Sequence, residues 1–138
     1  MNLALTYSTN LEKLQELVLD LKTSAPCDIN ISMHKVDLAS PIEIEKLLRE
    51  VKEQHSQPVE ILVANAGYGK RIANIWDIEL DQFEEAFNVN LRAPFLIVRG
   101  VVNGMKAKNW GRIIFVSSIA ASGGGINGCR KFTLILTS

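Results

Sequence analysis

Two hydrophobic periodicities alternate along this chain, and their order constrains the fold more than any other feature. Four short apolar or β-branched runs are typical of strands: 3–7, 29–38, 59–63 and 112–117. Three segments between them repeat apolar residues every three or four positions, as one face of a helix does: 11–21, 44–51 and 82–108. The run at 59–63 is almost continuously apolar, as in a strand buried on both faces. The order β-α-β-α-β-α-β predicts a parallel sheet with right-handed crossovers and helices on both faces.

Two helix starts carry recognisable capping signals. Thr9 stands three residues before Glu12, which forms a capping box with the threonine hydroxyl accepting from a first-turn N–H. Ser40 precedes Pro41 and Glu43, which combines an N-cap serine, a proline at the first helical position and a reciprocal glutamate. These signals predict helices that begin directly after Thr9 and Ser40.

Charge and composition exclude several classes of partner. Lys+Arg and Asp+Glu balance at 15 each, so no basic excess exists to bind nucleic acid or an anionic membrane. No apolar run reaches the ~20 residues that span a bilayer, and no signal peptide is recognisable, so we expect a cytoplasmic protein, or an organellar one whose targeting segment is absent. Cys27, Cys129, His34 and His55 lack metal-ligand spacing, so we expect free thiols, non-ligand histidines and no metal.

Open parallel sheets bind ligands at the carboxyl ends of their strands, so the residues after each strand are candidates. These residues are Ser8, Thr9 and Asn10, then Asp37 and Leu38, then Asn65, Ala66 and Gly67, then Ser117 and Ser118. Ser8 or Thr9 either donates to a phosphate or only caps the helix. Asp37 either accepts from an amine such as that of adenine or is a polar strand end. Asn65-Ala66-Gly67 allows a close backbone approach, although an ordinary turn also explains it.

Together with Asn90, these residues resemble the short-chain dehydrogenase/reductase family, in particular its 3-oxoacyl-carrier-protein-reductase-like members. The resemblance covers Leu3 to about Cys129. It implies that Asp37 and Leu38 contact adenine and that Asn65-Ala66-Gly67 stabilises the central sheet beside the cofactor. It also implies that Asn90 and Ser118 are catalytic and that Ser8-Thr9-Asn10 is the NADP-preferring form of its strand end, with NAD not excluded.

The resemblance implies a Rossmann-like, three-layer fold and hydride transfer between a nicotinamide and a small-molecule carbonyl or alcohol. In this family a Tyr acts as acid/base, a Lys lowers its pKa, and a Ser orients the carbonyl oxygen. Pro94 has no N–H, so the Asn90 carbonyl loses its helical donor and can hold a water of a proton relay. A packing kink without a chemical role is the alternative.

Two parts of the family pattern are not found in the chain. The family's first strand and its Gly-rich phosphate loop would lie before Met1, and the Tyr and Lys of Tyr-x-x-x-Lys would fall at Lys131 and Ile135. We therefore expect a partial NAD(P)-binding domain at 1–129, a divergent tail at 130–138, and a sheet without the family's first and C-terminal strands. Without the first strand, the strands at 3–7 and 59–63 lie ~10 Å apart, two strand spacings, unless they pair directly.

Three interpretations follow for the chain as it stands. It is an NADP-dependent oxidoreductase by family, recorded as an incomplete and inactive product. Alternatively, it is a non-catalytic module that dimerises, as family members do, through the long helix at 82–108. The third interpretation is a truncated gene-model product. In each case we expect a marginally stable, aggregation-prone chain, and the sequence does not identify a substrate.

Overall fold

The computed structural model describes residues 1–70, 72 and 74–118. Its strands are β1 (Asn2–Tyr7), β2 (Asn30–Lys35), β3 (Ile61–Ala64) and β4 (Arg112–Phe115). Its helices are α1 (Leu11–Ser24), α2 (Pro41–Gln54), α3 (Leu80–Phe87) and α4 (Ala93–Ala107), with a 3-10 turn η1 (Ile75–Asp77) and a π-helical turn η2 (Asn88–Arg92). The predicted α/β, Rossmann-like fold is confirmed, and the single helix expected at 82–108 is divided into three parts by η2.

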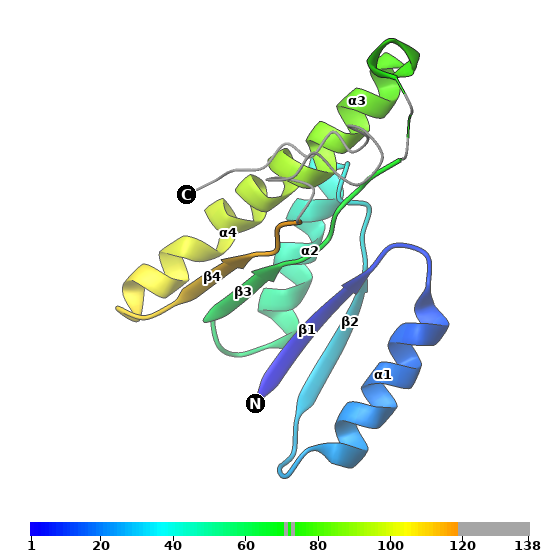
Figure 1. The fold of residues 1–138 in the computed structure, drawn as a ribbon. Helices are drawn as coiled ribbons and strands as arrows, with labels where there is room; N and C mark the ends of the chain where they lie inside the picture. Colours follow the sequence, from blue (N-terminus) through cyan, green and yellow to red (C-terminus); the bar gives the residue numbers. More distant parts are fainter. Residues whose placement is uncertain (71, 73, 119–138) are drawn as a thin grey trace.

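The strands form two parallel pairs instead of one sheet. β1 pairs with β2, and β3 pairs with β4. All four strands run in the same direction in the order β4, β3, β1, β2, so β1 and β3 are the inner strands (Figure 1). No backbone hydrogen bond joins β1 to β3 among the described residues. The sheet is therefore divided where the family resemblance places a first strand, and the direct pairing that the sequence left open does not occur.

Helices α2 and α4 pack against each other and connect the two halves. A Cβ atom at Gly100 would collide with Cδ1 of Leu48, so the glycine permits the close approach of α4 to α2. The buried apolar side chains come mainly from these two helices: Val36, Ile44, Leu47, Ala86, Ala93, Val101 and Met105. The hydrophobic core therefore lies along the α2–α4 contact, on one side of the strands.

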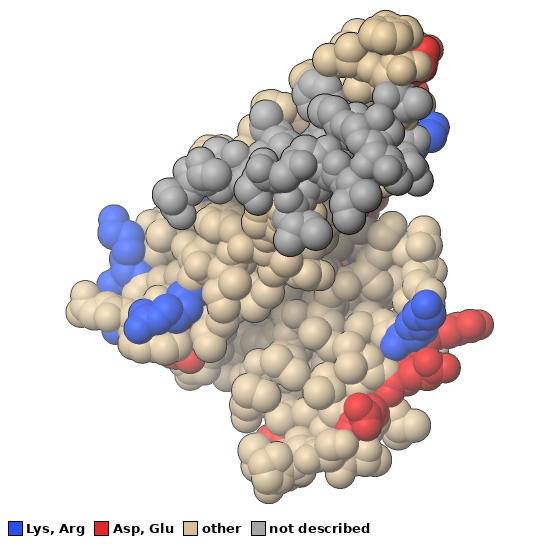
Figure 2. All heavy atoms as spheres, viewed as in Figure 1, with Lys and Arg blue, Asp and Glu red and all other residues tan. Residues whose placement is uncertain are grey.

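The opposite side of β3 and β4 is apolar and exposed. Ile61, Val63, Ile114 and Val116 are 56%, 53%, 49% and 52% exposed, and we call this surface the open face. Residues that alternate with them, such as Leu62, point the other way and are less exposed. Burial of the run at 59–63 on both faces was predicted from its sequence, and this prediction is wrong for the described structure. Charged side chains lie mainly at the margins of the view in Figure 2.

The two predicted helix caps have different outcomes. Asn10, not Thr9, caps α1, because its Oδ1 accepts from the Lys13 N–H at 3.1 Å. Ser40 caps α2 as predicted and accepts from the Glu43 N–H at 3.3 Å. The first prediction misplaced the cap by one residue, since asparagine and threonine are both good caps and only the backbone geometry decides between them.

A buried polar chain joins β2 to α2. Ser32 Oγ lies 2.8 Å from His34 Nε2 and 2.7 Å from His55 Nε2, and His34 Nδ1 lies 3.0 Å from Glu50 Oε2. His34 and His55 are only 2% and 6% exposed. The sequence places both histidines outside metal sites but does not predict that they share one serine.

The hydroxyl of Ser32 has a single proton, which orders this chain. With neutral imidazoles, His34 Nδ1–H donates to Glu50, the Ser32 hydroxyl donates to His34 Nε2, and His55 Nε2–H donates to Ser32. His55 Nδ1 then carries only a lone pair, and this buried atom has no partner among the described residues. The hydrogen bond from His34 is the main cause that lowers the pKa of the Glu50 carboxyl, and Lys46 lowers it further. This bond therefore stabilises the fold above the ordinary glutamate pKa and is lost as the pH falls through the lowered value.

We expect Ser32→Ala to loosen the docking of α2 on β2. The substitution leaves two buried imidazole nitrogens without their partner, which costs about 1–3 kcal/mol for an unsatisfied buried group. Residue-resolved hydrogen exchange of the α2 amides measures the effect, and we expect exchange to become about tenfold faster or more. Ser56→Ala at an exposed serine is the matched control. Equal α2 protection in both variants would show that the polar chain does not hold the helix.

Candidate functional site

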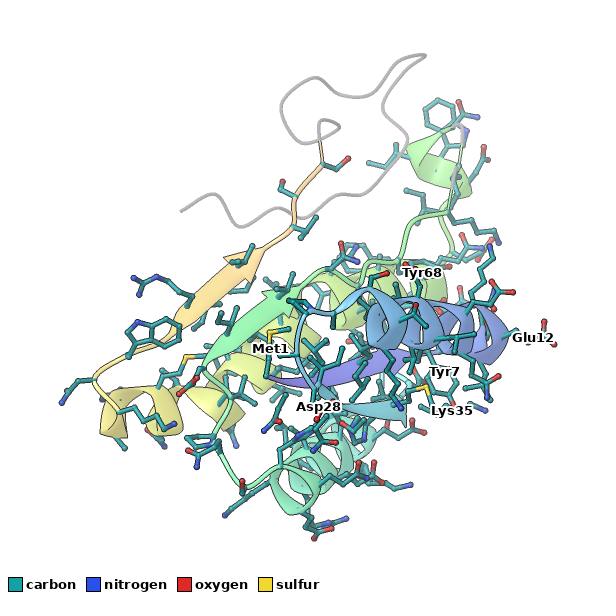
Figure 3. The ribbon with its side chains drawn as sticks, turned by 90° about the horizontal axis from the view of Figure 1, so that it is seen from below. Met1, Tyr7, Glu12, Asp28, Lys35 and Tyr68 are labelled. Carbon is teal, nitrogen blue, oxygen red and sulfur yellow. The ribbon has the colours of Figure 1, made fainter. Side chains whose placement is uncertain are left out.

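The predicted site residues lie at one edge of the structure. Tyr7 and Lys35 end β1 and β2, and Tyr68 follows β3; all three lie at the same end, opposite Met1 and Asp28 (Figure 3). This end is the carboxyl edge of the parallel strands, where α/β folds bind ligands. The candidate residues that follow the four strands are at this edge: Ser8, Thr9, Asn10, Asp37, Leu38, Asn65, Ala66, Gly67 and Ser118.

The side chain of Asn90 fixes the loop after β3. Its Nδ2 donates to the Tyr68 carbonyl at 2.9 Å, and its Oδ1 accepts from the Tyr68 N–H at 2.8 Å. A Cβ atom at Gly67 would lie 3.6 Å from Asn90 Oδ1, an ordinary contact, and the backbone there is not left-handed. The described residues therefore give no reason for glycine at 67, while Asn90 connects η2 to the loop that carries Asn65-Ala66-Gly67.

The turn η2 is wide where the sequence predicts a disturbed helix. The Ala93 N–H donates to the Asn88 carbonyl, five residues back, which is a π-helical bond. Pro94 follows directly and has no N–H to donate to the Asn90 carbonyl. Such single π turns occur often at functional sites. The position of the disturbance agrees with the predicted release of the Asn90 carbonyl, and its role in holding a water stays a prediction.

The end of β1 presents hydroxyl groups. Ser8 and Thr9 are exposed, and neither side chain takes part in a hydrogen bond among the described residues. The helix cap is supplied by Asn10, so the alternative in which Ser8 or Thr9 caps α1 is wrong. Both hydroxyls therefore face solvent at the carboxyl edge, and the side-chain amide of Asn10 is already engaged.

The loop after β2 is held in place from two sides. Asp37 Oδ1 accepts from the Ala39 N–H at 2.9 Å, and Glu43 Oε2 accepts from the Asp37 N–H at 2.6 Å. Arg92 of η2 donates to the Ala39 carbonyl at 3.4 Å. The second oxygen of the exposed Asp37 carboxylate takes no part in these bonds, so an ordered acceptor is presented at the edge.

Tyr68 differs from the acid/base tyrosine that the family resemblance implies. The pKa of its phenol is raised, chiefly by a hydrogen bond to Glu85, with burial and the charges of Glu85 and Asp81 acting in the same direction. A raised pKa keeps the phenol protonated and opposes its use as a base near neutral pH. Ser118 lies three residues beyond β4, and the positions 131 and 135 that the family's Tyr and Lys would occupy lie outside the described residues, as does Cys129.

The described ranges contain neither a candidate metal centre nor a membrane-spanning helix. No group of three or more His, Cys, Asp or Glu side chains is arranged there to hold a metal ion. None of the described helices combines the length and the apolar character needed to cross a bilayer. Cys27 is a free, exposed thiol.

Comparison with known proteins identifies a single family. The family profile described as short chain dehydrogenase matches residues 1–130. The chain is 35% identical over 85 residues to D-beta-hydroxybutyrate dehydrogenase of Rhizobium meliloti, and 34% identical over 88 residues to 3-oxoacyl-acyl-carrier-protein reductase MabA of Mycobacterium avium. These alignments cover 62% and 64% of the chain.

The structural comparison agrees. A metagenomic short-chain oxidoreductase crystallised with NADP superimposes with a TM-score of 0.79 and 26% identity, covering 91% of this chain and 54% of that one. The alignments span about a third of the two curated relatives, 32% and 34% of their lengths. Because the family profile matches nearly the whole sequence and the fold agrees, the chain belongs to the short-chain dehydrogenase family.

Proposed function

We propose that this chain forms the adenosine side of an NADP site in an oxidoreductase that transfers hydride between nicotinamide and a small-molecule carbonyl or alcohol. The observation that carries the proposal is the pair of solvent-facing hydroxyls, Ser8 and Thr9, at the end of β1. They are neutral donors at the position where the family resemblance places the selectivity for the extra phosphate of NADP. Two solved relatives with NADP bound, at 26% and 24% identity, support the same cofactor.

Each strand end has a distinct part in this proposal. Ser8 and Thr9 donate to the ribose phosphate, with Asn10 fixing the start of α1 behind them. The open oxygen of Asp37 accepts from the adenine amine, and Leu38 lies beside the ring. Asn65, Ala66 and Gly67 form the backbone that passes the cofactor, held in place through Tyr68 by Asn90.

The proposed reaction places the remaining two residues at the substrate end. Bound NADPH supplies the hydride. The Ser118 hydroxyl orients the carbonyl oxygen of the substrate, and the Asn90 carbonyl holds a water for proton transfer. The sequence contains no Tyr-x-x-x-Lys, since its two tyrosines are Tyr7 and Tyr68. We therefore assign nucleotide binding to this chain and expect no turnover from it alone.

Ser8→Asp tests the NADP assignment. A carboxylate at this position repels a phosphate and suits a bare ribose. We expect NADPH to bind about tenfold more weakly or worse, a loss of ~1.4 kcal/mol, while NADH binding is unchanged or improved. Titration followed by nicotinamide fluorescence measures both affinities.

The matched control is Ser56→Asp, which adds the same charge at an exposed serine after α2. It is expected to leave both affinities unchanged. A similar loss for NADPH in both variants would mean that net charge, not the end of β1, determines the effect. Equal weakening of NADPH and NADH by Ser8→Asp would contradict the phosphate assignment.

A second candidate function is an interaction module that joins an intact reductase or a second copy through residues 82–108. Apolar exposure along this region favours it: Phe87 and Phe95 are 40% and 60% exposed. Family members that assemble through this helix would bury such side chains. The hydroxyl-bearing edge is independent of that surface, so nucleotide binding is the function that the site geometry supports best.

A further inference from the structure

The inner edge of β1 carries unpaired backbone groups. The Asn30 N–H donates to the Met1 carbonyl at 3.1 Å, and the Val36 N–H donates to the Tyr7 carbonyl at 3.0 Å. In a parallel pair, alternate residues direct both backbone groups to the same neighbour, so the odd-numbered residues of β1 bond to β2. Asn2, Ala4 and Thr6 therefore direct their N–H and C=O groups away from β2, toward β3 (Figure 1).

The inner edge of β3 has the same property. The Arg112 N–H donates to the Glu60 carbonyl at 2.9 Å, and the Val116 N–H donates to the Ala64 carbonyl at 3.1 Å. The even-numbered residues therefore bond to β4, and Ile61 and Val63 direct their backbone groups toward β1.

These five residues define what we call the strand slot: Asn2, Ala4, Thr6, Ile61 and Val63. Its two edges belong to strands that run in the same direction, and no described hydrogen bond closes it. Unpaired edges of this kind are templates for another strand. The side chains of Ile61 and Val63 are about half exposed, and charged residues lie mainly at the margins of the visible face (Figure 2). The slot thus offers hydrogen bonds along both edges and apolar surface between charged margins.

We propose that the strand slot binds an apolar β-strand of about five residues, parallel to β1 and β3, donated by a separate polypeptide. Only an extended backbone presents alternating N–H and C=O groups to both edges at once. One face of this strand lies beside Ile61 and Val63 of the open face, and the other lies on the side of the α2–α4 contact. Both surroundings are apolar, so the partner strand is continuously rich in Val and Ile.

A second copy of the chain does not supply this strand from its described residues. Each of its four described strands is already paired, and each is flanked by its own connections. The inference is independent of nucleotide binding, because the slot runs along the strands while the Ser8 and Thr9 hydroxyls lie beyond the end of β1.

A synthetic peptide tests the proposal directly. The probe is an acetylated and amidated Lys-Val-Ile-Val-Ile-Val-Lys, and the readout is residue-resolved amide exchange of the full chain. In the free chain we expect Ala4, Thr6, Ile61 and Val63 to exchange at least tenfold faster than the paired Leu5 and Leu62. The peptide should slow the fast amides at least tenfold.

The matched control is the same peptide with N-methyl groups on alternate residues. It keeps every side chain and removes the donors along one edge, so it should give no protection. Equal protection by both peptides would reduce the effect to apolar adhesion and overturn the proposal. Slow exchange at the slot in the free, dilute chain would show that the chain fills its own slot. Protection that appears only with rising chain concentration would assign it to a second copy. Either outcome, or fast exchange with and without the peptide, overturns the proposal.

Discussion

The purified chain is expected to unfold over a broad temperature range, without one cooperative transition, and to self-associate at micromolar concentration. Its sheet is divided between β1 and β3, so no ladder of hydrogen bonds couples the two halves. The α2–α4 contact is the main connection between them. The open face and the strand slot then expose apolar surface and bare strand edges, which are the usual sites of aggregation.

Circular dichroism melts combined with light scattering on a sizing column measure both parts of this prediction. Adding the Val/Ile peptide should sharpen the transition, because a strand that binds the folded state stabilises it. The N-methylated peptide provides the control. A sharp, reversible transition from a monomer without peptide would contradict the prediction and would mean that the two halves fold as one cooperative unit.

The second expected result is the absence of hydride transfer by the chain alone. Reduction of a carbonyl needs a proton donor beside the developing alkoxide. Of the two tyrosines in the sequence, Tyr68 is tied to Glu85, which raises its pKa and keeps the phenol protonated, and neither is followed four residues later by lysine. General acid–base catalysis typically contributes a factor of ~10²–10⁴, so turnover should fall to background without such a group.

NADPH oxidation with acetoacetyl-CoA as carbonyl acceptor, followed by absorbance, tests this result. An acetoacetyl-CoA reductase such as that of Allochromatium vinosum, 34% identical over 90 residues, serves as the positive control. Ser118→Ala of this chain distinguishes true activity from a contaminating enzyme. Carbonyl-dependent oxidation that disappears in Ser118→Ala would refute the expected inactivity and would show that another group supplies the proton.

The sequence predicts the order of elements well because strand and helix periodicities are local. The strands begin and end within a few residues of their predicted positions, and Ser40 caps α2 as its sequence indicates. The buried face of β2 is not predictable in this way. Met33 is 40% exposed while the neighbouring Ser32 and His34 are buried, because Glu50 and His55 approach from α2 and complete their hydrogen bonds. Such burial depends on the partner helix.

The candidate site shows the same division. Topology places the predicted strand-end residues at one edge, and the family resemblance supplies their proposed roles. The bonds between Asn90 and Tyr68 span 22 residues and have no local sequence signal, so the sequence does not predict them. Pro94 did indicate the position of η2, because a proline that cannot donate disturbs the preceding turn.

The turn η2 makes the site sensitive to chain length more than to residue identity. Asn90 reaches the loop after β3, and Arg92 reaches the loop after β2, both from the same π-helical turn. One residue inserted or deleted before them would rotate both side chains by about 100° around the helix axis. A substitution at either position breaks one tether, whereas a single-codon insertion or deletion misdirects both at once. Descendants of this sequence are therefore expected to vary in residue type along η2 more readily than in residue number.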